Sequence, residues 1–430
     1  MSSDRALIGY LYRRAGFGAT SAQLDAGSAA GYEHTVEELL AGLTAPDPNT
    51  PVLPHLSSAE ALNTGHGGDT YDEYVNLVAW WVEKMATTPT PLREKLTLLL
   101  HGQFPTAISK VGMPIYMHTQ NQILRTKGPG PFDELALALS LDPAMLTWLD
   151  LSSNQRQSPN ENFGRELMER FTMGIGNYSQ RDVREASRAL TGWSIAYPSG
   201  RFQFNTWAHD FGEKTLLGHR GNLAGQDVVR IVTHTEASHR WVPARMWSFL
   251  AYPVKPSDPV VSDLAPGYAS DLNMTNLLRA IFMHPNFTSV RAQQGLVKQP
   301  VEWVAGIMRG LNLRTESFKS KGGAGYLLWV LTNLGQIPFN PPTVGGWGNN
   351  EYWLSTAASL AQLNFVQTVS EVAHVSSIQE TAGGSRVAVL GEMLGIQNWT
   401  PRTNALLQHV RDDFTRLVPL ALTAPENITN

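Results

Sequence analysis

Ionisable residues gather in one short segment, Asn160–Arg170. Glu161, Arg165 and Glu169 are spaced four residues apart, and Glu166 directly follows the arginine. In a helix this spacing places the three side chains on one face. An arginine between carboxylates could bind a substrate anion, or it could shift the pKa of the carboxyl groups. A solvated ladder of ion pairs, each worth about 0.2–0.5 kcal/mol, explains the same spacing without chemistry.

A second group of polar residues lies in the segment Trp207–Lys214. His209, Asp210 and Lys214 bring an imidazole, a carboxylate and an amine within six positions. Such groups can serve as acids, bases or metal ligands. Neighbouring side chains on a strand point to opposite faces, however. A polar loop at the end of a hairpin is therefore the alternative interpretation.

Two further candidates are His101 and Trp347. His101 closes an apolar helix, where the helix dipole and the free carbonyl groups give a histidine a purely structural role as the alternative. Trp347 ends the segment Pro338–Trp347, which contains glycines and aromatic residues. Its aromatic side chains could cover a pocket, and a rigid turn wedged between helices is the alternative.

Composition and missing motifs exclude several classes of protein. The chain of 430 residues has no cysteine, which excludes disulfides, thiolate metal sites and cysteine nucleophiles. Its net charge of -4 and the lack of a basic run argue against nucleic acid as a partner. The sequence has no phosphate-binding loop motif, no Gly-x-Ser-x-Gly motif and no HExxH motif. No apolar run is long enough for a transmembrane helix, so we expect no membrane partner.

The elements that must position these residues are mostly helices. Ser158-Pro159-Asn160-Glu161 predicts a capping box and the start of a helix that runs to about Thr172. Residues 201–205 alternate between polar and apolar side chains after a turn signal, which predicts a strand. We therefore expect a mainly α protein: a single large helical domain over residues 1–430, with a small β-hairpin insertion near 194–217.

Several motifs in combination resemble a known family. They are Leu11–Gly18, Arg93–Lys95, His101–Phe104, Ser109–Val111, Asp142–Met145, Pro159–Asn162, Arg165–Gly174, Arg188–Trp193, His209–Lys214, Lys298–Glu302, Gly335–Phe339 and Pro341–Trp347. This set is similar to the domain of unknown function 1800 (DUF1800) family. The resemblance covers about residues 5–365, and we expect C-terminal helices over 366–420 to pack on that part.

The resemblance implies a bacterial protein whose biochemical function was not established when the family was defined. Family members are often exported, and they are frequently encoded beside a second family related in fold to sulfatases and alkaline phosphatases. A protein of that sulfatase- or phosphatase-like family is therefore a possible partner. The family pattern also places polar residues at the candidate positions between 160 and 214. Gln103 stands where members often have a second histidine, which argues against a two-histidine metal site at 101–103.

Two functions are consistent with these observations. The leading one is an enzyme with hydrolytic or other acid–base chemistry in a polar pocket built on the 158–172 helix and the 207–214 loop. The alternative is a non-catalytic binding or assembly protein, in which the same residues form a buried salt-bridge network. The expected catalytic residues are Glu166, Glu169, Arg165, His209, Asp210 and Lys214, and the expected substrate-binding residues are Asn160, Glu161, His101 and Trp347.

Each expected catalytic residue has a role in the enzyme hypothesis. Glu166 or Glu169 would be a general base or a ligand to a divalent metal, which is the one cofactor that we consider. Arg165 would bind an anion, and Lys214 would stabilise negative charge. The first residues show no charged leader followed by an apolar stretch, so we expect a cytoplasmic protein, or an exported one if a leader has been removed.

Overall fold

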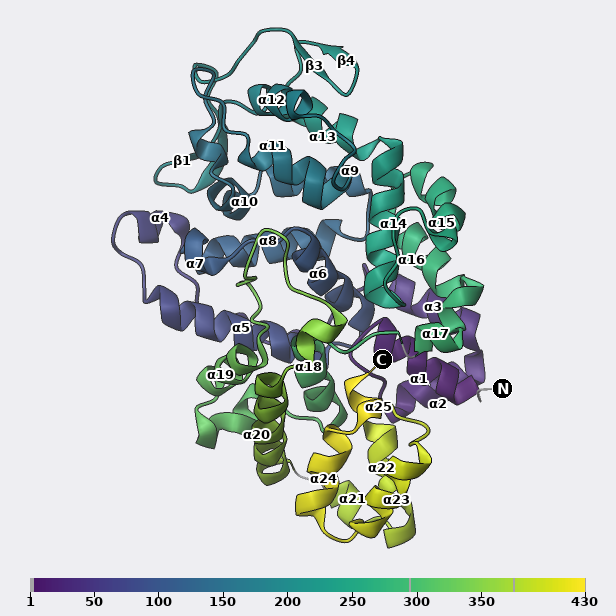
Figure 1. Cartoon of the computed structure of the whole chain (residues 1–430). Helices are drawn as coiled ribbons and strands as arrows, with labels where there is room; N and C mark the ends of the chain where they lie inside the picture. Colours follow the sequence, from purple (N-terminus) through teal and green to yellow (C-terminus); the bar gives the residue numbers. More distant parts are fainter. Residues whose placement is uncertain (1–3, 294, 374–375, 430) are drawn as a thin grey trace.

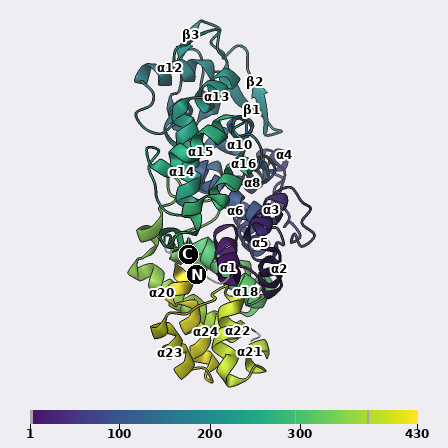
Figure 2. The same ribbon diagram turned by 90° about the vertical axis from the view of Figure 1, so that its right-hand side faces the viewer.

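Helices make up most of the computed structural model, which describes residues 4–293, 295–373 and 376–429. The molecule is elongated: the β-strands lie at one end, and the C-terminal helices form the other end (Figures 1 and 2). The first helix of the chain lies beside the last one, between these two ends of the molecule (Figure 1). The mainly α fold expected from the sequence is confirmed.

The helices fall into three consecutive groups. The first contains α1 (Asp4–Arg14), α2 (Ser21–Ala30), α3 (Tyr32–Ala41), α4 (Ala59–Asn63), α5 (Thr70–Thr87), α6 (Pro91–Gln103), α7 (Ile108–Val111), α8 (Pro114–Lys127), α9 (Phe132–Ser140) and α10 (Pro143–Trp148). The second contains η1 (Leu151–Ser153), α11 (Asn162–Glu166), η2 (Leu167–Thr172), α12 (Gln180–Ala189), α13 (Gly225–Thr233), α14 (Glu236–Leu250), α15 (Pro259–Ala269), α16 (Met274–Met283), η3 (Pro285–Thr288) and α17 (Val290–Gln293). The third contains α18 (Pro300–Gly310), η4 (Thr315–Lys321), α19 (Ala324–Leu334), η5 (Asn350–Trp353), α20 (Thr356–Val372), α21 (Ser376–Gln379), η6 (Gly383–Ser385), α22 (Arg386–Met393), α23 (Pro401–His409), α24 (Phe414–Leu422) and α25 (Pro425–Ile428).

Two antiparallel hairpins interrupt the helices between α12 and α13. Strands β1 (Trp193–Ala196) and β2 (Arg201–Phe204) pair in one, with Trp193 opposite Phe204. Strands β3 (Lys214–Leu216) and β4 (His219–Gly221) pair in the other. The predicted strand at 201–205 is therefore confirmed as β2. The second hairpin was not expected, because its three-residue strands are too short for an alternating pattern to be recognised.

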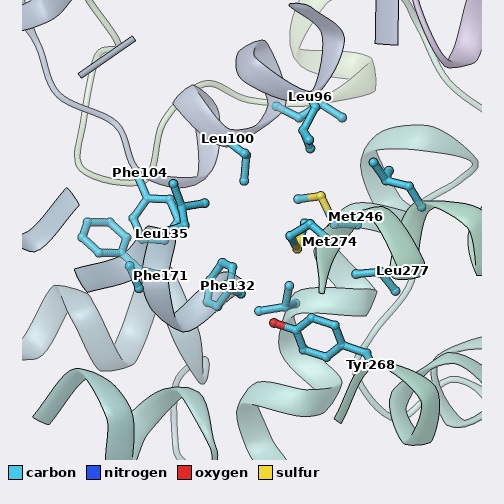
Figure 3. Close-up of a cluster of buried hydrophobic side chains, with 14 of the residues drawn as sticks. Leu96, Leu100, Phe104, Phe132, Leu135, Phe171, Met246, Tyr268, Met274 and Leu277 are labelled. Carbon is cyan, nitrogen blue, oxygen red and sulfur yellow. The ribbon is translucent and has the colours of Figure 1, made fainter. Parts of the chain in front are cut away.

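The buried hydrophobic side chains form two clusters. One lies among α1–α3, α6 and the helices from α9 to α16, and the other surrounds α5, α18, α19, α20 and α24. Figure 3 shows part of the first cluster, to which α6, α9, η2, α14, α15 and α16 contribute side chains. In it the Phe104 ring lies 5.1 Å from the Phe171 ring and 5.7 Å from the Phe132 ring. These contacts fix the end of α6 against η2, which carries candidate site residues.

The predicted start of the helix at Ser158 is wrong. Helix α11 begins at Asn162, and Glu161 at its N-cap makes no capping hydrogen bond. The side chain of Asn160 instead accepts the backbone N–H of Asn162 at 2.9 Å. The backbone N–H of Asn160 in turn donates to the side chain of Asn154 at 2.8 Å. An asparagine turn anchored to the preceding loop thus replaces the capping box, because Asn side chains compete well for nearby backbone groups.

Candidate functional site

Glu166 and Glu169 lie where α-helix changes into π-helix. Residues 167–172 form η2, a π-helix, and the backbone N–H of Met173 accordingly donates to the carbonyl of Met168, five residues back, at 2.9 Å. The hydroxyl of Thr172 donates to the carbonyl of Leu167 at 2.6 Å. Short π-helical turns are rare and are frequently found at functional sites. This turn places the two carboxylates on the border between the core and the surface.

The carboxylate of Glu166 has an unusual environment. Its Oε2 atom is buried and makes no hydrogen bond to any described residue. The closest cation is Arg170, whose Nε atom lies 4.0 Å from Oε2. Burial raises the pKa of Glu166 above its ordinary value, and the negative charge of Glu169 raises it further. Glu166 is thus a carboxyl group that holds a proton more readily than a surface glutamate.

The second carboxylate, Glu169, is held by a phenol. The hydroxyl of Tyr178 donates to Oε2 of Glu169 at 2.5 Å, and Arg170 lies 3.4 Å from Oε1. Partial burial and then the hydrogen bond to Glu169 raise the pKa of Tyr178 to about 12. Tyr178 therefore stays protonated as a hydrogen-bond donor, and Glu169 is fixed beside Glu166.

A polar contact beneath η2 connects it to α6 and α14. The side-chain amide of Gln103 donates to the carbonyl of Phe171 at 2.8 Å and to that of Arg170 at 3.2 Å. The Nε atom of Arg245 donates to the side-chain oxygen of Gln103 at 3.0 Å. Burial lowers the pKa of Arg245 to about 10. Gln103 thus supplies hydrogen bonds to carbonyl groups that the π-helix leaves available.

Arg165 and Glu161 form a pair that is partly open to solvent. Arg165 lies 3.0 Å from Oε2 of Glu161, and each side chain is about one third exposed. Gln180 joins them, since its amide donates to Glu161 at 2.7 Å and its oxygen accepts from Arg165 at 3.0 Å. Arg184 lies 3.7 Å from Glu161. The expected ion pair between residues 161 and 165 is present, and it ties α11 to α12.

His209 is buried among aromatic rings. Its Nδ1 atom donates to the carbonyl of Thr191 at 2.7 Å. Its ring centroid lies 4.7 Å from that of Phe211 and 5.1 Å from that of Phe204. These contacts hold the segment after β2 against the end of α12.

Asp210 and Lys214 are engaged in fixing the same segment. Asp210 accepts from Nε of Arg188 at 2.8 Å and from the backbone N–H of Gly212 at 2.8 Å. Burial alone would raise the pKa of Asp210, but these hydrogen bonds outweigh it and lower the pKa. The amine of Lys214 is buried and donates to the carbonyls of Asp210 and Gly212. Both side chains thus have structural partners.

His101 and Trp347 meet on the other side of α6. Their ring centroids lie 5.3 Å apart. The Nε2 atom of His101 accepts the backbone N–H of Phe339 at 3.0 Å, and burial lowers the pKa of His101 to about 3. His101 is therefore neutral and fixes the segment that leads to Trp347.

The structure brings together only part of the expected set. Glu166 and Glu169 share the π-helical turn, and Asn160, Glu161 and Arg165 lie at or before the start of the same helix. Within the described residues, no hydrogen bond or ion pair joins His209, Asp210 or Lys214 to either of the two carboxylates of η2. These three residues instead hold the segment between β2 and β3 against the end of α12.

The sequence reasoning missed Arg170, Tyr178 and Arg245 as parts of this environment. Arg245 stands four residues from both Trp241 and Phe249 in α14, and its guanidinium lies 4.6 Å from the centre of the Phe249 ring. An arginine between two aromatic residues on one helix face is a signal that could have identified it. Tyr178 offered no such signal, because its contact with Glu169 depends on the turn that closes η2.

In the described ranges, no three His, Asp or Glu side chains lie together in a way that could hold a metal ion. The divalent metal therefore stays a prediction, and no set of ligand residues for it is found among the described residues. None of the described helices is long and apolar enough to cross a membrane.

Comparison with known proteins supports the resemblance seen in the sequence motifs. The family model described as "Protein of unknown function (DUF1800)" matches residues 10–428. No curated protein and no solved structure matches the chain. The match extends the resemblance from about residue 365 through the C-terminal helices. Because it covers nearly the whole sequence, the chain belongs to the DUF1800 family.

Proposed function

We propose that this protein is an enzyme in which Glu166 transfers a proton to or from the substrate. The observation that carries the proposal is the buried Oε2 atom of Glu166, which makes no hydrogen bond among the described residues. Buried polar atoms are nearly always paired, so an unpaired one calls for an explanation. Proton exchange with a substrate provides such an explanation, because the substrate would then be the missing hydrogen-bond partner.

The pKa of Glu166 supports this role. A general acid or base works best when its pKa is near the working pH. Burial raises the pKa of Glu166, and the nearby charge of Glu169 adds to that effect. Two neighbouring carboxyl groups in different environments are typical of acid–base pairs. Glu169, which Tyr178 holds at 2.5 Å, would act as the positioning partner.

The other expected catalytic residues receive supporting roles in this proposal. Arg165 pairs with Glu161 and would orient the start of α11. His209, Asp210 and Lys214 would hold the hairpin segment in place. The proposed chemistry is hydrolysis, with Glu166 donating a proton to the leaving group and taking one from water. A single carboxyl group can perform both of these proton transfers in turn.

The test compares Glu166→Gln with Glu134→Gln, the same change at a glutamate of α9 whose side chain is 64% exposed and which belongs to none of the expected site residues. Both variants and the unchanged protein would be assayed against chromogenic phosphate, sulfate and carboxylate esters and against chromogenic glycosides. We expect Glu166→Gln to lower kcat by about 10²–10⁴-fold on the substrate that is cleaved. Glu134→Gln should keep kcat within about threefold. Equal activity of all three proteins, or no cleavage of any of these substrates, would contradict the proposal.

A second candidate is a non-catalytic binding or assembly protein. The observation that favours it is a set of exposed aromatic side chains on and beside the hairpins, where Trp207 is 83% exposed and Tyr197 is 76% exposed. Exposed aromatic residues are enriched at protein interfaces. In this case the partner would be a protein of the sulfatase- or phosphatase-like family, and the two proteins would co-elute in gel filtration. Trp207→Ser would abolish this co-elution and leave the circular dichroism signal of the helices unchanged.

A further inference from the structure

A cleft of about 890 Å³ lies far from Glu166, between the N-terminal helix and the C-terminal helices. Tyr10 and Arg13 of α1 line one side, and Gln397, Thr400, Arg402 and Glu426 line the other. Helix α25 lies beside α1 (Figure 1). A β-carbon added at Gly9 of α1 would lie 3.5 Å from the side chain of Gln397, in the segment after α22. The volume is in the usual range for sites that bind small organic molecules.

Two hydrogen-bond donors of this cleft have no acceptor among the residues that the structure describes. The Nε atom of Arg13 and the Nε2 atom of Gln397 are both buried, and neither makes a hydrogen bond to a described residue. The other end of the Arg13 guanidinium donates to the carbonyl of Gly395, which fixes the side chain in position. Two donors without a partner among the described residues, from the two segments that line one cleft, call for an acceptor.

Within the described part of the chain, the interior behind Arg13 carries more cations than carboxylates. Arg14, Lys95 and Lys298 lie close enough to interact with one another or with Glu302, which is the only carboxylate among these groups. Lys95 forms an ion pair with Glu302, and Lys298 donates to the side chain of Asn427 at 3.2 Å. Burial lowers the pKa of Lys298 to about 7, and the charge of Arg13 contributes to the shift. Buried cations in such excess favour an anion nearby.

The charges at the rim offset one another. Glu426 lines the cleft as a carboxylate that accepts the backbone N–H of Thr400 at 2.8 Å and the hydroxyl of Thr403 at 3.2 Å. Arg402 adds a cation to the same lining. Among the described residues, the buried groups of the cleft that lack a hydrogen bond are therefore donors, and the positive charge behind Arg13 is left over.

We propose that this cleft binds a small organic anion, whose carboxylate, phosphate or sulfate group accepts hydrogen bonds from Arg13 and Gln397. An oxyanion has only acceptors, so it matches the unpaired donors and the excess of positive charge together. Thr400 and Glu426 then face the uncharged part of the ligand. Glu166 does not line this cleft, so the anion site can be tested independently of the proposed chemistry.

The experiment measures anion binding by calorimetry, and by the rise in Tm, at constant ionic strength set with sodium chloride. The probes are inorganic phosphate, sulfate, citrate and acetate. A bound anion raises stability in proportion to the logarithm of its concentration over Kd. The variants are Arg13→Met, which removes the charge but keeps most of the length, and Gln397→Glu, which replaces a donor by a repelling carboxylate. The control is Arg5→Met, on the same helix, where the arginine pairs with Asp25 and Glu392 outside the cleft lining.

We expect at least one probe to bind, and we expect Arg13→Met and Gln397→Glu each to weaken it by at least about tenfold. Arg5→Met should bind as the unchanged protein does. Binding of phosphate and sulfate alone assigns the cleft to phosphate or sulfate esters, and binding of citrate or acetate alone assigns it to carboxylates. If Arg13→Met does not fold, Gln397→Glu decides, because Gln397 follows α22 in a loop. Absence of binding up to about 10 mM of every probe, or binding by both cleft variants that is as tight as that by the unchanged protein, overturns the proposal.

Discussion

The Nε2 atom of His101 accepts the backbone N–H of Phe339 at 3.0 Å. This hydrogen bond joins the end of α6 to the segment that carries Trp347. Phe339 has a left-handed backbone conformation, with a φ of 66°, which is unusual for a bulky residue. The His101 ring is 1% exposed and is packed against Trp81, Phe339 and Trp347. A neutral imidazole therefore helps to hold a strained turn in place.

Because His101 is buried in its neutral form, the protein should lose stability in acid. Burial lowers the pKa of His101 to about 3, below its ordinary value of 6.5. A lowered pKa means that the stabilisation is complete above pH 6.5 and is lost as the pH falls towards 3. We expect the urea-unfolding free energy to fall more steeply below pH 6.5 in the unchanged protein than in His101→Gln. His66→Gln, at an exposed histidine, is the control, and parallel curves for His101→Gln and the unchanged protein would contradict the prediction.

Asp142 should have the opposite pH dependence. Burial raises its pKa from the ordinary 3.8 to about 7, although it accepts hydrogen bonds from Gln120 and from the backbone of Met145. A raised pKa means that stability is complete below about pH 3.8 and declines as the pH rises towards 7. Asp142→Asn cannot ionise, so its stability relative to the unchanged protein should improve between pH 3.8 and about pH 7. Asp69→Asn, at the exposed N-cap of α5, should show no such trend.

Much of the fold could be predicted from the sequence, because helix signals are local. The capping box of Ser179 and Asp182 is present, with the backbone N–H of Ser179 donating to Asp182 at 2.8 Å. The signal at Ser158 failed because Asn154 and Asn160, close in sequence but folded over by a turn, compete for the same backbone groups. Local patterns cannot show which of two polar networks is better satisfied.

The candidate site was harder to predict than the fold. Spacing identified the pair of Glu161 and Arg165 correctly, since both residues lie one helical turn apart. It could not predict the π-helical turn that follows, which separates Glu169 from that ladder and directs it to Tyr178. The sequence did not predict the cleft at all, because Arg13 and Gln397 are brought together only by long-range packing.

The buried pair of Glu94 and Arg125 offers a test of core electrostatics. Arg125 binds both carboxylate oxygens of Glu94 at 2.7 Å, and Trp81 donates to the same carboxylate at 3.0 Å. Glu94 is 0% exposed, so removing only the arginine leaves a buried charge without its partner. We expect Arg125→Met to lower the unfolding free energy by about 3–5 kcal/mol in urea titrations. The double variant Glu94→Gln, Arg125→Met should recover part of that loss, and a single variant that costs under about 1 kcal/mol would contradict this explanation.

Asp210 supports the hairpin region through its ion pair with Arg188. Arg188 also holds Glu185 at 3.0 Å, and Glu185 accepts the backbone N–H of Thr215 in β3 at 2.8 Å. Asp210→Asn should therefore destabilise the protein by about 1.5–3 kcal/mol at neutral pH, the usual worth of a hydrogen bond to a charged group. Because the pKa of Asp210 is lowered, its stabilisation is present above its ordinary pKa of 3.8 and is lost as the pH falls below that value. The two proteins should then converge in acid, and hydrogen exchange in residues 209–221 should be faster in the variant at neutral pH. A loss of activity without faster exchange would instead return Asp210 to the catalytic set.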